Sequence, residues 1–396
     1  MNLSTIHSKI LMKLLILHNR YNQRGGEDSV FEAESALLRE HGEIVQTLEF
    51  TNDSFSNGWR RLVGGILSIF NPFSFVRVLR TIRKFRPDVL HIHNLFSTAT
   101  PSVIWAAKIL RVPVVMTLHN FRLICPSATL LYDGKVYEKS LRSFFPFDAV
   151  RKRVYRDSFM QTLALAMTTT LHRCLGTWKL VNRFIVLSQF SKAKFLESKL
   201  GVPANHLIVK PNFVADRGSA FTKGNDFLFV GRLSPEKGIP ILLDAFIGTS
   251  NSLTVVGDGP LRNSVESAVL QSPNIRYLGS KSGADVIDLM RNAKALVFPS
   301  IWYEGMPMVI LESFSVATPV IASRLGTMAE IIQDQLNGLH FEPSNAVDLR
   351  KAVETLSKDS ALHAQLCQGA RETWERLYSP DRNYELLMQV YHEGNS

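Results

Sequence analysis

Short apolar runs alternate with amphipathic stretches along most of this 396-residue chain. In the first half, runs rich in Val, Ile and Leu predict strands that are buried on both faces, at Leu14–Leu17, Ile44–Leu48, Val89–Ile92, Val114–Leu118 and Phe184–Leu187. Apolar residues at helical spacing predict helices between them, at Glu27–Glu40, Ser102–Leu110 and Ser191–Leu200. Strands that alternate with helices predict a parallel sheet with right-handed crossovers.

The second half repeats this alternation. Its predicted strands are Phe227–Val230, Leu253–Val256, Ile275–Leu278, Ala295–Phe298 and Val320–Ala322, and its predicted helices are Ile239–Phe246, Leu261–Leu270, Val286–Asn292, Met308–Ala317 and Ala346–Leu356. Two such units predict an α/β fold of two Rossmann-like, doubly wound domains. The polar stretch Pro211–Asn225 places their boundary near residue 212. Ligands of such sheets bind beyond the carboxyl ends of the strands, so chemistry is expected just after strands.

The composition is that of a globular protein. With 20% charged residues, 23 Gly and 17 Pro, the chain is not collagen-like, a coiled coil or wholly disordered. No apolar run approaches the roughly 18–20 residues of a membrane-spanning helix, and the short apolar stretch at Lys13–His18 does not resemble a secretory signal. Three widely spaced cysteines argue against a disulfide framework or zinc site and fit a reducing cytoplasm.

The charge is concentrated in the first half. Residues 1–212 carry 29 basic and 14 acidic side chains, a net charge of +15, whereas the remainder has a net charge of −5. This asymmetry indicates an anionic partner for the first half only: nucleic acid, an anionic membrane surface or a phosphate-bearing substrate.

A glycine pair follows the first strand. Gly25 and Gly26 precede a helix, where glycines allow the backbone to approach a phosphate or a sugar. The alternative is a plain tight turn, because Glu27 and Asp28 in the first helical turn would repel an anion. The segment is not a dinucleotide fingerprint, since no G-x-G-x-x-G follows the strand.

Histidines end two further strands. His91, His93 and Asn94 follow one strand and His119 follows the next. His-x-His suggests zinc, but no third ligand of Cys or carboxylate type follows at a fitting interval, so we expect no metal. These residues are either hydrogen-bonded histidines at strand ends or, in the sharper interpretation, His119 contacts a substrate hydroxyl.

Basic residues and glycines follow strands in the second half. After Gly231, Arg232 and Lys237 could reach one anion, and a guanidinium with an ammonium suits a diphosphate, although such residues are often only solvated. Gly257 lies in V-V-G-D-G-P, a good strand-to-helix loop whether or not it binds a ligand.

The stretch V-F-P-S-I-W-Y-E-G-M-P-M-V-I-L-E-S is the strongest signal. Glu304 lies in a Gly-bearing loop before a helix that Pro307 is expected to begin, and Glu312 lies in that helix. Helix N-termini bind phosphate, and carboxylates accept hydrogen bonds from vicinal sugar hydroxyls. Together these features predict a site for a sugar nucleotide.

In these motifs the chain resembles a family-four glycosyltransferase of the GT-B fold. The resemblance rests on G-G-E-D, D-V-L-H-I-H-N, T-L-H-N-F-R-L-I-C-P, V-K-P-N-F-V, F-V-G-R-L-S-P-E-K-G, V-V-G-D-G-P and E-G-M-P-M-V-I-L-E. It implies an N-terminal acceptor-binding domain over residues 1–212, a donor-binding domain over 213–380, and a last helix at 381–396 that crosses back to the first domain. It also implies retention of anomeric configuration, without a metal or a cofactor.

The resemblance implies a role for each candidate residue. Arg232 and Lys237 would hold the donor diphosphate, and His119 would touch the donor sugar or the leaving phosphate. Glu304 would contact the transferred sugar beside the backbone N–H groups of Gly305 and Met306. Glu312 would contact the ribose of the donor, and residues around Tyr277–Lys281 would contact its base. The expected binding set is completed by Tyr277, Lys281, Gly257, Gly25, Gly26, His93 and Asn94.

Two basic stretches suggest a surface partner. Seven basic residues and no acidic residue lie in Trp59–Arg86, and five more lie in Arg142–Arg156, both interleaved with apolar and aromatic residues. This pattern suits an anionic bilayer surface; the alternatives are a solvated helix face and a nucleic-acid site, for which no recognised module appears.

The sequence therefore predicts a retaining glycosyltransferase that takes a sugar from a nucleotide diphosphate to a hydroxyl of a glycan or lipid-linked acceptor in surface polysaccharide biosynthesis. We expect it in the cytoplasm, peripheral on the inner face of the membrane, without nucleic acid as a partner. The rival hypotheses are a GT-B sugar-nucleotide epimerase and a nucleotide-binding partner protein that has lost its chemistry.

Overall fold

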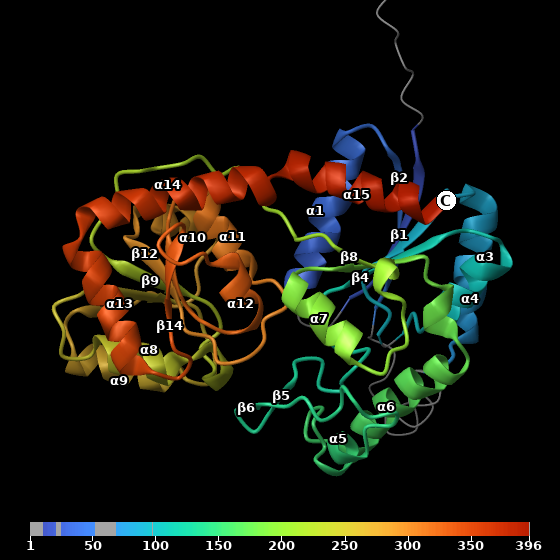
Figure 1. Ribbon diagram of the computed structural model, residues 1–396, viewed down its shortest axis with the longest axis horizontal. Coiled ribbons are helices and arrows are strands. Elements are labelled where there is room, and N and C mark those ends of the chain that lie inside the picture. Colours follow the sequence, from blue (N-terminus) through green and yellow to red (C-terminus); the bar gives the residue numbers. More distant parts are fainter. Residues whose placement is uncertain (1–10, 21–24, 52–68, 97, 396) are drawn as a thin grey trace, which may run out of the picture.

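The computed structural model describes residues 11–20, 25–51, 69–96 and 98–395. Two six-stranded sheets, parallel throughout, organise the chain into two lobes that lie side by side (Figure 1). The sheet of the first lobe has the order β2-β1-β3-β4-β7-β8, with β1 at Lys13–Asn19, β2 at Ile44–Phe50, β3 at Val89–Ile92, β4 at Val114–Leu118, β7 at Arg183–Val186 and β8 at Leu207–Val209. The predicted fold class, two parallel-sheet α/β domains, is confirmed.

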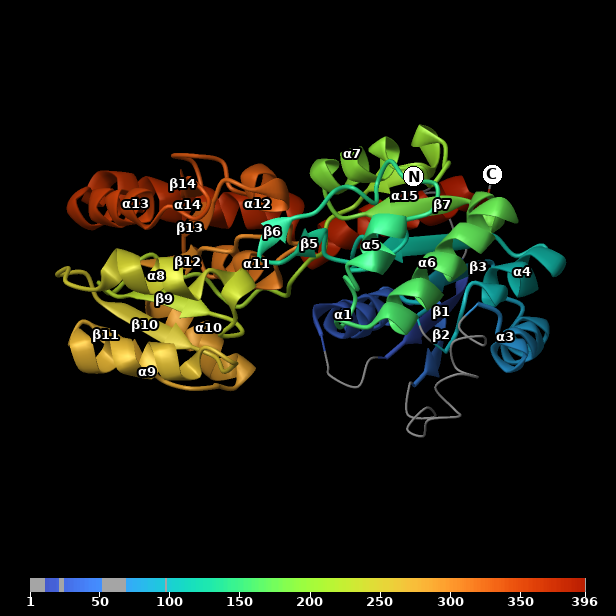
Figure 2. The ribbon, with the colours of Figure 1, turned by 90° about the horizontal axis from the view of Figure 1, so that it is seen from below.

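Helices lie on both sides of the first sheet (Figure 2). They are α1 (Gly26–Glu40), α3 (Pro72–Phe85), α4 (Ser102–Ile109), α5 (Phe147–Arg151), α6 (Phe159–Cys174) and α7 (Gln189–Glu197), and a short hairpin joins β5 (Leu131–Tyr132) to β6 (Lys135–Val136). Side chains alternate along β1, so that Leu15 and Leu17 pack with one buried cluster while Leu14 and Ile16 pack with the other.

The second lobe has the same construction. Its sheet order is β11-β10-β9-β12-β13-β14, with β9 at Phe227–Val230, β10 at Leu253–Val256, β11 at Ile275–Tyr277, β12 at Ala295–Phe298, β13 at Val320–Ser323 and β14 at Gly338–Phe341. Its helices are α8 (Ile239–Phe246), α9 (Arg262–Gln271), α10 (Gly283–Asn292), α11 (Met308–Ser315), α12 (Gly326–Ile331), α13 (Ala346–Lys358) and α14 (Ser360–Leu377). Phe227 and Phe229 face one core of this lobe, and Leu228 faces the other.

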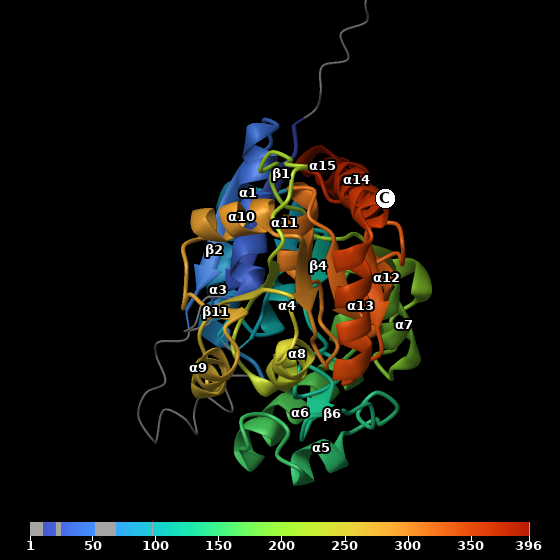
Figure 3. The ribbon, with the colours of Figure 1, turned by 90° about the vertical axis from the view of Figure 1, so that its left-hand side faces the viewer.

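The last helix belongs to the first lobe. After α14 has passed along the second lobe, α15 (Pro380–Asn395) continues onto the first, as the red helices of Figures 1 and 3 show. Leu387, Val390 and Tyr391 of α15 are buried against Leu14 and Ile16 of β1. The first lobe is therefore built from two segments that are separated in the sequence by the whole second lobe.

Five of the ten predicted strands have the observed bounds and the other five differ by at most two residues at either end, because an uninterrupted run of Val, Ile, Leu or Phe fits a strand that is covered on both faces. Elements that the apolar pattern missed are β14, the β5–β6 hairpin, and helices α3, α5, α6, α12 and α14. Within the described residues, none of the helices is both long enough and apolar enough to cross a membrane.

Candidate functional site

A cleft of about 330 Å³ separates the carboxyl ends of the two sheets. Its walls come from both lobes: the loop after β1, the loop after β4 and the loop between β12 and α11. Among the expected site residues, the cleft brings together Gly25, Gly26, His119, Glu304, Gly305 and Met306. The two lobes touch here, since a Cβ atom on Gly305 would lie only 2.5 Å from the backbone oxygen of His119.

Glu304 is held in place by three donors. The ammonium of Lys237, the hydroxyl of Ser300 and the indole N–H of Trp302 donate to its Oε1 at 2.7, 2.8 and 2.6 Å. The residue is only 7% exposed. A buried carboxylate needs such partners, and converging donors leave Glu304 in a defined orientation at the wall of the cleft. The sequence did not indicate Ser300 or Trp302, although both lie within four residues of Glu304.

Lys237 and Arg232 lie on the loop after β9 but have separate partners. Lys237 pairs with Glu304, whereas the guanidinium of Arg232 donates to Glu236 at 2.8 Å and its side chain is 60% exposed. Gly238 ends this loop with a φ of 74°, and a Cβ there would lie 1.9 Å from the carbonyl oxygen of Pro299. The loop after β9 therefore approaches the loop after β12 closely, and this places Lys237 beside Glu304.

Several expected donor contacts do not line this cleft. Arg232, Lys237, Gly257, Tyr277, Lys281 and Glu312 are not among its lining residues, although Lys237 contacts Glu304, which is. Gly257 has a packing reason of its own: its φ is 137°, and a Cβ would lie 1.8 Å from the backbone oxygen of Gly231. The hydroxyl of Tyr277 donates to the Gly257 carbonyl at 3.0 Å. Burial raises the pKa of Glu312 on α11, opposed by the charge of Arg217.

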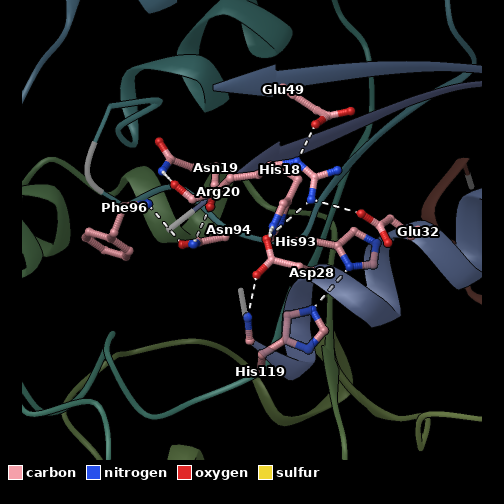
Figure 4. A network of polar contacts seen from close by, with 11 residues as sticks. His18, Asn19, Arg20, Asp28, Glu32, Glu49, His93, Asn94, Phe96 and His119 are labelled. Atoms are coloured by element: carbon pink, nitrogen blue, oxygen red, sulfur yellow. Dashed lines mark hydrogen bonds and ion pairs between the residues drawn. The ribbon is translucent and has the colours of Figure 1, made fainter. Parts of the chain in front are cut away.

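Asn94 has a structural role. Its amide donates to the backbone oxygen of Asn19 at 2.8 Å, and its Oδ1 accepts from the backbone N–H of Phe96 at 3.0 Å. The amide thus joins the loop after β3 to the end of β1, and Oδ1 stabilises the loop after β3 itself (Figure 4). The residue is 5% exposed, and both ends of its side chain are engaged in these bonds, so direct binding of a substrate by Asn94 stays a prediction.

The sequence suggests that Glu27 and Asp28, in the first turn of α1, would repel an anion, and the structure modifies this expectation. Asp28 is buried, accepts from the backbone N–H of Gly25 at 2.8 Å and lies 2.8 Å from Nε2 of His18 (Figure 4). Glu27 lines the cleft, and burial raises its pKa to about 7. Asp28 is therefore committed to capping the helix, and Glu27 carries a proton for much of the time at neutral pH.

Histidines form a buried group under the cleft. His93 Nδ1 lies 3.1 Å from His119 Nε2, and the two rings stack. His91 contacts Tyr391 and Thr117 through its two ring nitrogens, both at 2.8 Å. Burial lowers the pKa of His119 to about 3, so that its imidazole is neutral at physiological pH.

One group of side chains has the composition of a metal site. Ligand atoms of Glu34, His91 and His93 lie within 4.8 Å of one another. However, the ammonium of Lys210 already contacts Glu34 at 2.5 Å, and both ring nitrogens of His91 are hydrogen-bonded. A cationic partner and occupied nitrogens do not fit a metal ion, and we assign none here.

Two family models match consecutive parts of the chain. Residues 58–216 match the model described as Glycosyltransferase Family 4, and residues 214–373 match the model described as Glycosyl transferases group 1. An uncharacterized glycosyltransferase of Methanocaldococcus jannaschii is 36% identical over 168 residues, which cover 42% of this chain and 47% of that protein. An O-antigen chain mannosyltransferase C of Escherichia coli is 28% identical over 171 residues, which cover 42% of this chain and 46% of that protein. The chain thus spans about half the length of these curated relatives.

A solved structure supports the fold over nearly the whole chain. HepE of Anabaena, determined in complex with UDP, superposes with a TM-score of 0.68 at 17% identity, covering 96% of this chain and 100% of that one. At this identity the likeness concerns the fold alone. The two matched regions support a glycosyltransferase of the family 4 type, and the structural likeness shows the GT-B fold.

Proposed function

We propose that this protein is a retaining glycosyltransferase that transfers a sugar from a nucleoside diphosphate to an acceptor hydroxyl. The observation that carries the proposal is the Glu304 carboxylate, which Lys237, Ser300 and Trp302 hold at the wall of a cleft between two parallel sheets. A carboxylate held in one orientation is a good acceptor for sugar hydroxyls. The backbone N–H groups of Gly305 and Met306 lie beside it in the same loop.

The departing diphosphate requires positive charge. Arg232 and Lys237 would stabilise the charge that develops on the leaving oxygen, together with the N-terminus of α11. For Arg232 this means exchanging its surface partner Glu236 for the diphosphate when the donor binds. We assign no carboxylate as a nucleophile, propose retention by attack on the same face, and propose that neither a metal nor a cofactor takes part.

For the donor, we propose a nucleotide whose ribose carries a 2′-hydroxyl. This favours uridine or guanosine diphosphate sugars over deoxythymidine diphosphate sugars. HepE of Anabaena has been solved with UDP and with UDP-glucose, which supports testing uridine donors first. Glu312 would bind the ribose, Gly257, Tyr277 and Lys281 would lie toward the base, and Gly25 and Gly26 would allow close approach of the substrate from the first lobe.

For the acceptor, we propose a glycan or a lipid-linked glycan of a surface polysaccharide. The name of the related E. coli O-antigen chain mannosyltransferase supports this class. The basic first lobe supports a location at the inner face of the cytoplasmic membrane, without a spanning helix. Of the basic stretch Trp59–Arg86, residues 59–68 lie outside the described part of the chain; in the remainder, Phe73 is 78% exposed beside the exposed Arg77 and Arg80 of α3.

A donor screen tests the proposal. Purified protein is incubated with UDP- and GDP-sugars, with and without an acceptor glycan, and the released nucleoside diphosphate is measured. Acceptor-dependent release, with a product whose anomeric configuration matches that of the donor, is the expected result. Conversion of the nucleotide sugar without acceptor would indicate an epimerase instead, and nucleotide binding without turnover would indicate a partner protein.

A further inference from the structure

Four side chains form a continuous row under the cleft: Lys210, Glu34, His93 and His119. Lys210 follows β8, Glu34 lies on α1, and the histidines follow β3 and β4. The Lys210 ammonium lies 2.5 Å from Glu34 Oε1, Glu34 Oε2 lies 3.4 Å from His93 Nε2, and His93 Nδ1 lies 3.1 Å from His119 Nε2. Figure 4 shows the His93–His119 end of the row.

The first pair in the row is charged. Lys210 and Glu34 are both fully buried, at 0% exposure, and a buried ammonium requires a counter-charge. Although burial raises the pKa of Glu34, the charge and the hydrogen bond of Lys210 hold it below its usual value. Glu34 is therefore a carboxylate, which can only accept hydrogen bonds.

The contact with Glu34 determines which ring nitrogen of His93 carries the proton. Burial lowers the pKa of His93 well below its ordinary value, so the ring is neutral and carries one N–H. Its Nε2 and Glu34 Oε2 are both buried, have no hydrogen-bond partner within the described residues, and face each other at 3.4 Å. A carboxylate opposite a bare ring nitrogen would be repulsive, so the proton of His93 belongs on Nε2.

The position of the proton on His93 determines which ring nitrogen of His119 is protonated. Because Nε2 of His93 carries the proton, its Nδ1 is an acceptor, and His119 Nε2 must donate to it across 3.1 Å. The neutral ring of His119 has only one proton, which leaves Nδ1 bare. His119 is half-buried at the wall of the cleft, and Nδ1 makes no hydrogen bond to the part of the chain that the structure describes.

We propose that Lys210 and Glu34 are positioning residues that act through His93 to present His119 as a pure hydrogen-bond acceptor, which receives a hydroxyl of the transferred sugar. The inference rests on the proposed function and chooses between the two roles expected for His119. A phosphate oxygen needs an N–H donor, which this tautomer cannot offer, whereas a sugar hydroxyl can donate to a bare nitrogen.

The tautomer can be observed directly. Full-length protein labelled with ¹⁵N-histidine is measured by two-bond ¹H–¹⁵N correlation, with His93→Gln and His119→Gln used only to assign the signals. Neutral rings protonated at Nε2 are expected for both residues. A His119 protonated at Nδ1, or a doubly protonated ring, would overturn the inference, whether or not a donor has been identified.

A variant pair tests whether the row sets the tautomer. Glu34→Gln combined with Lys210→Met removes both buried charges together, which avoids leaving one of them unpaired. The glutamine amide can donate to His93 Nε2, so both rings should gain a population protonated at Nδ1. The control is Glu43→Gln, which removes another buried carboxylate of the same lobe, at the opposite end of β1. An unchanged tautomer in the folded double variant, or the same change in the control, would contradict a positioning role.

Calorimetric titration separates this inference from the proposed function. UDP and GDP are titrated into the wild-type protein and into His119→Ala. Affinity within about twofold of the wild type is expected for the variant, because the product carries no sugar; a tenfold or greater loss would assign His119 to the phosphate and overturn the inference. If no nucleoside diphosphate binds the wild type, the proposed function fails, and the tautomer result still decides whether the row acts as described.

Discussion

Glu330 of α12, in the second lobe, caps helix α7 of the first lobe by accepting a hydrogen bond from the backbone N–H of Gln189. Its second oxygen accepts from the next N–H, that of Phe190, and both distances are 2.9 Å. The N-terminus of a helix carries partial positive charge, so a carboxylate there is favourable. Beside it, the hydroxyls of Ser188 and Thr327 lie 3.1 Å apart. One lobe thus supplies a helix cap to the other.

Replacing this cap should weaken the contact between the lobes. We expect Glu330→Ala to lower the free energy of unfolding by about 0.5–2 kcal/mol, as for other helix caps. Urea denaturation measures this, with Glu342→Ala as the control, because Glu342 is exposed and lies 3.9 Å from Arg324. Equal effects of the two variants would mean that the cap contributes nothing beyond a surface charge.

The diphosphate site can be tested at Arg232 and Lys237. A hydrogen bond to a charged group contributes about 1.5–3 kcal/mol, so each Ala variant should lower donor turnover about 10–150-fold while the protein stays folded. The loss should be larger for Lys237→Ala, since Lys237 also orients Glu304. Lys358→Ala, which breaks an exposed pair with Glu354 on α13, is the matched control. Near-wild-type turnover of the double variant Arg232→Ala/Lys237→Ala would refute the site.

The two glutamates of the last motif should differ in what they recognise. Glu304→Gln is expected to lower turnover and leave the affinity for free nucleoside diphosphate nearly intact, because Glu304 would face the sugar. Glu312 lies further along, about one turn after the first residue of α11, and Glu312→Gln should weaken nucleoside diphosphate binding. Calorimetry and transfer rates measure the two effects. The reverse pattern would show that the donor binds in the opposite orientation, with its nucleoside at Glu304 and its sugar at Glu312.

Glu27 should make stability depend on pH. Its pKa rises from 4.5 to about 7 on folding, because the carboxyl is desolvated. Ionisation therefore favours the unfolded chain, and stability is lost as the pH rises from about 4.5 to 7. Glu27→Gln should be more stable than the wild type by about 1–3 kcal/mol at pH 8, and about equal at pH 4. A difference that does not change with pH would exclude the burial of a neutral carboxyl; Glu40→Gln, at an exposed site on the same helix, is the control.

Membrane association should need exposed aromatic residues of the first lobe. Phe73 of α3 and Phe147 of α5 are 78% and 75% exposed, next to basic side chains. Sedimentation with anionic vesicles should show binding that weakens with salt, and the double variant Phe73→Ser/Phe147→Ser should bind less. The control is Phe221→Ser, because Phe221 is 51% exposed and lies in the segment that joins β8 to β9. Equal binding to neutral vesicles would count against an anionic surface as the partner.

The sequence predicted the fold well where a local signal exists. The strands Val89–Ile92, Val114–Leu118, Phe227–Val230, Leu253–Val256 and Ala295–Phe298 have the predicted bounds. The strand at Gly338–Phe341 was missed, because a glycine and a histidine interrupt its apolar run. The helix at Pro72–Phe85 was not predicted as an element, although its four basic residues and its apolar residues at helical spacing are typical of an amphipathic helix.

The site was only partly predictable for a different reason. Glu304 and His119 follow strands, and the geometry of parallel sheets brings such positions to one cleft. Glu34 and Lys210 are 176 positions apart, and no local pattern distinguishes them from surface charges. Asn94 shows why position alone does not assign a role, since a polar residue after a strand can hydrogen-bond to neighbouring loops as well as to a ligand.

The helix α15 also has a consequence for synthesis on the ribosome. Its buried residues Leu387, Val390 and Tyr391 complete an apolar cluster with Leu14 and Ile16 of β1 and with Phe31 and Leu38 of α1. Because translation proceeds from the N-terminus, the first lobe emerges early but can complete this cluster only after the entire second lobe has been made. Until then, its apolar face is available to chaperones or to aggregation, and expressing the two lobes as separate fragments would make that exposure permanent.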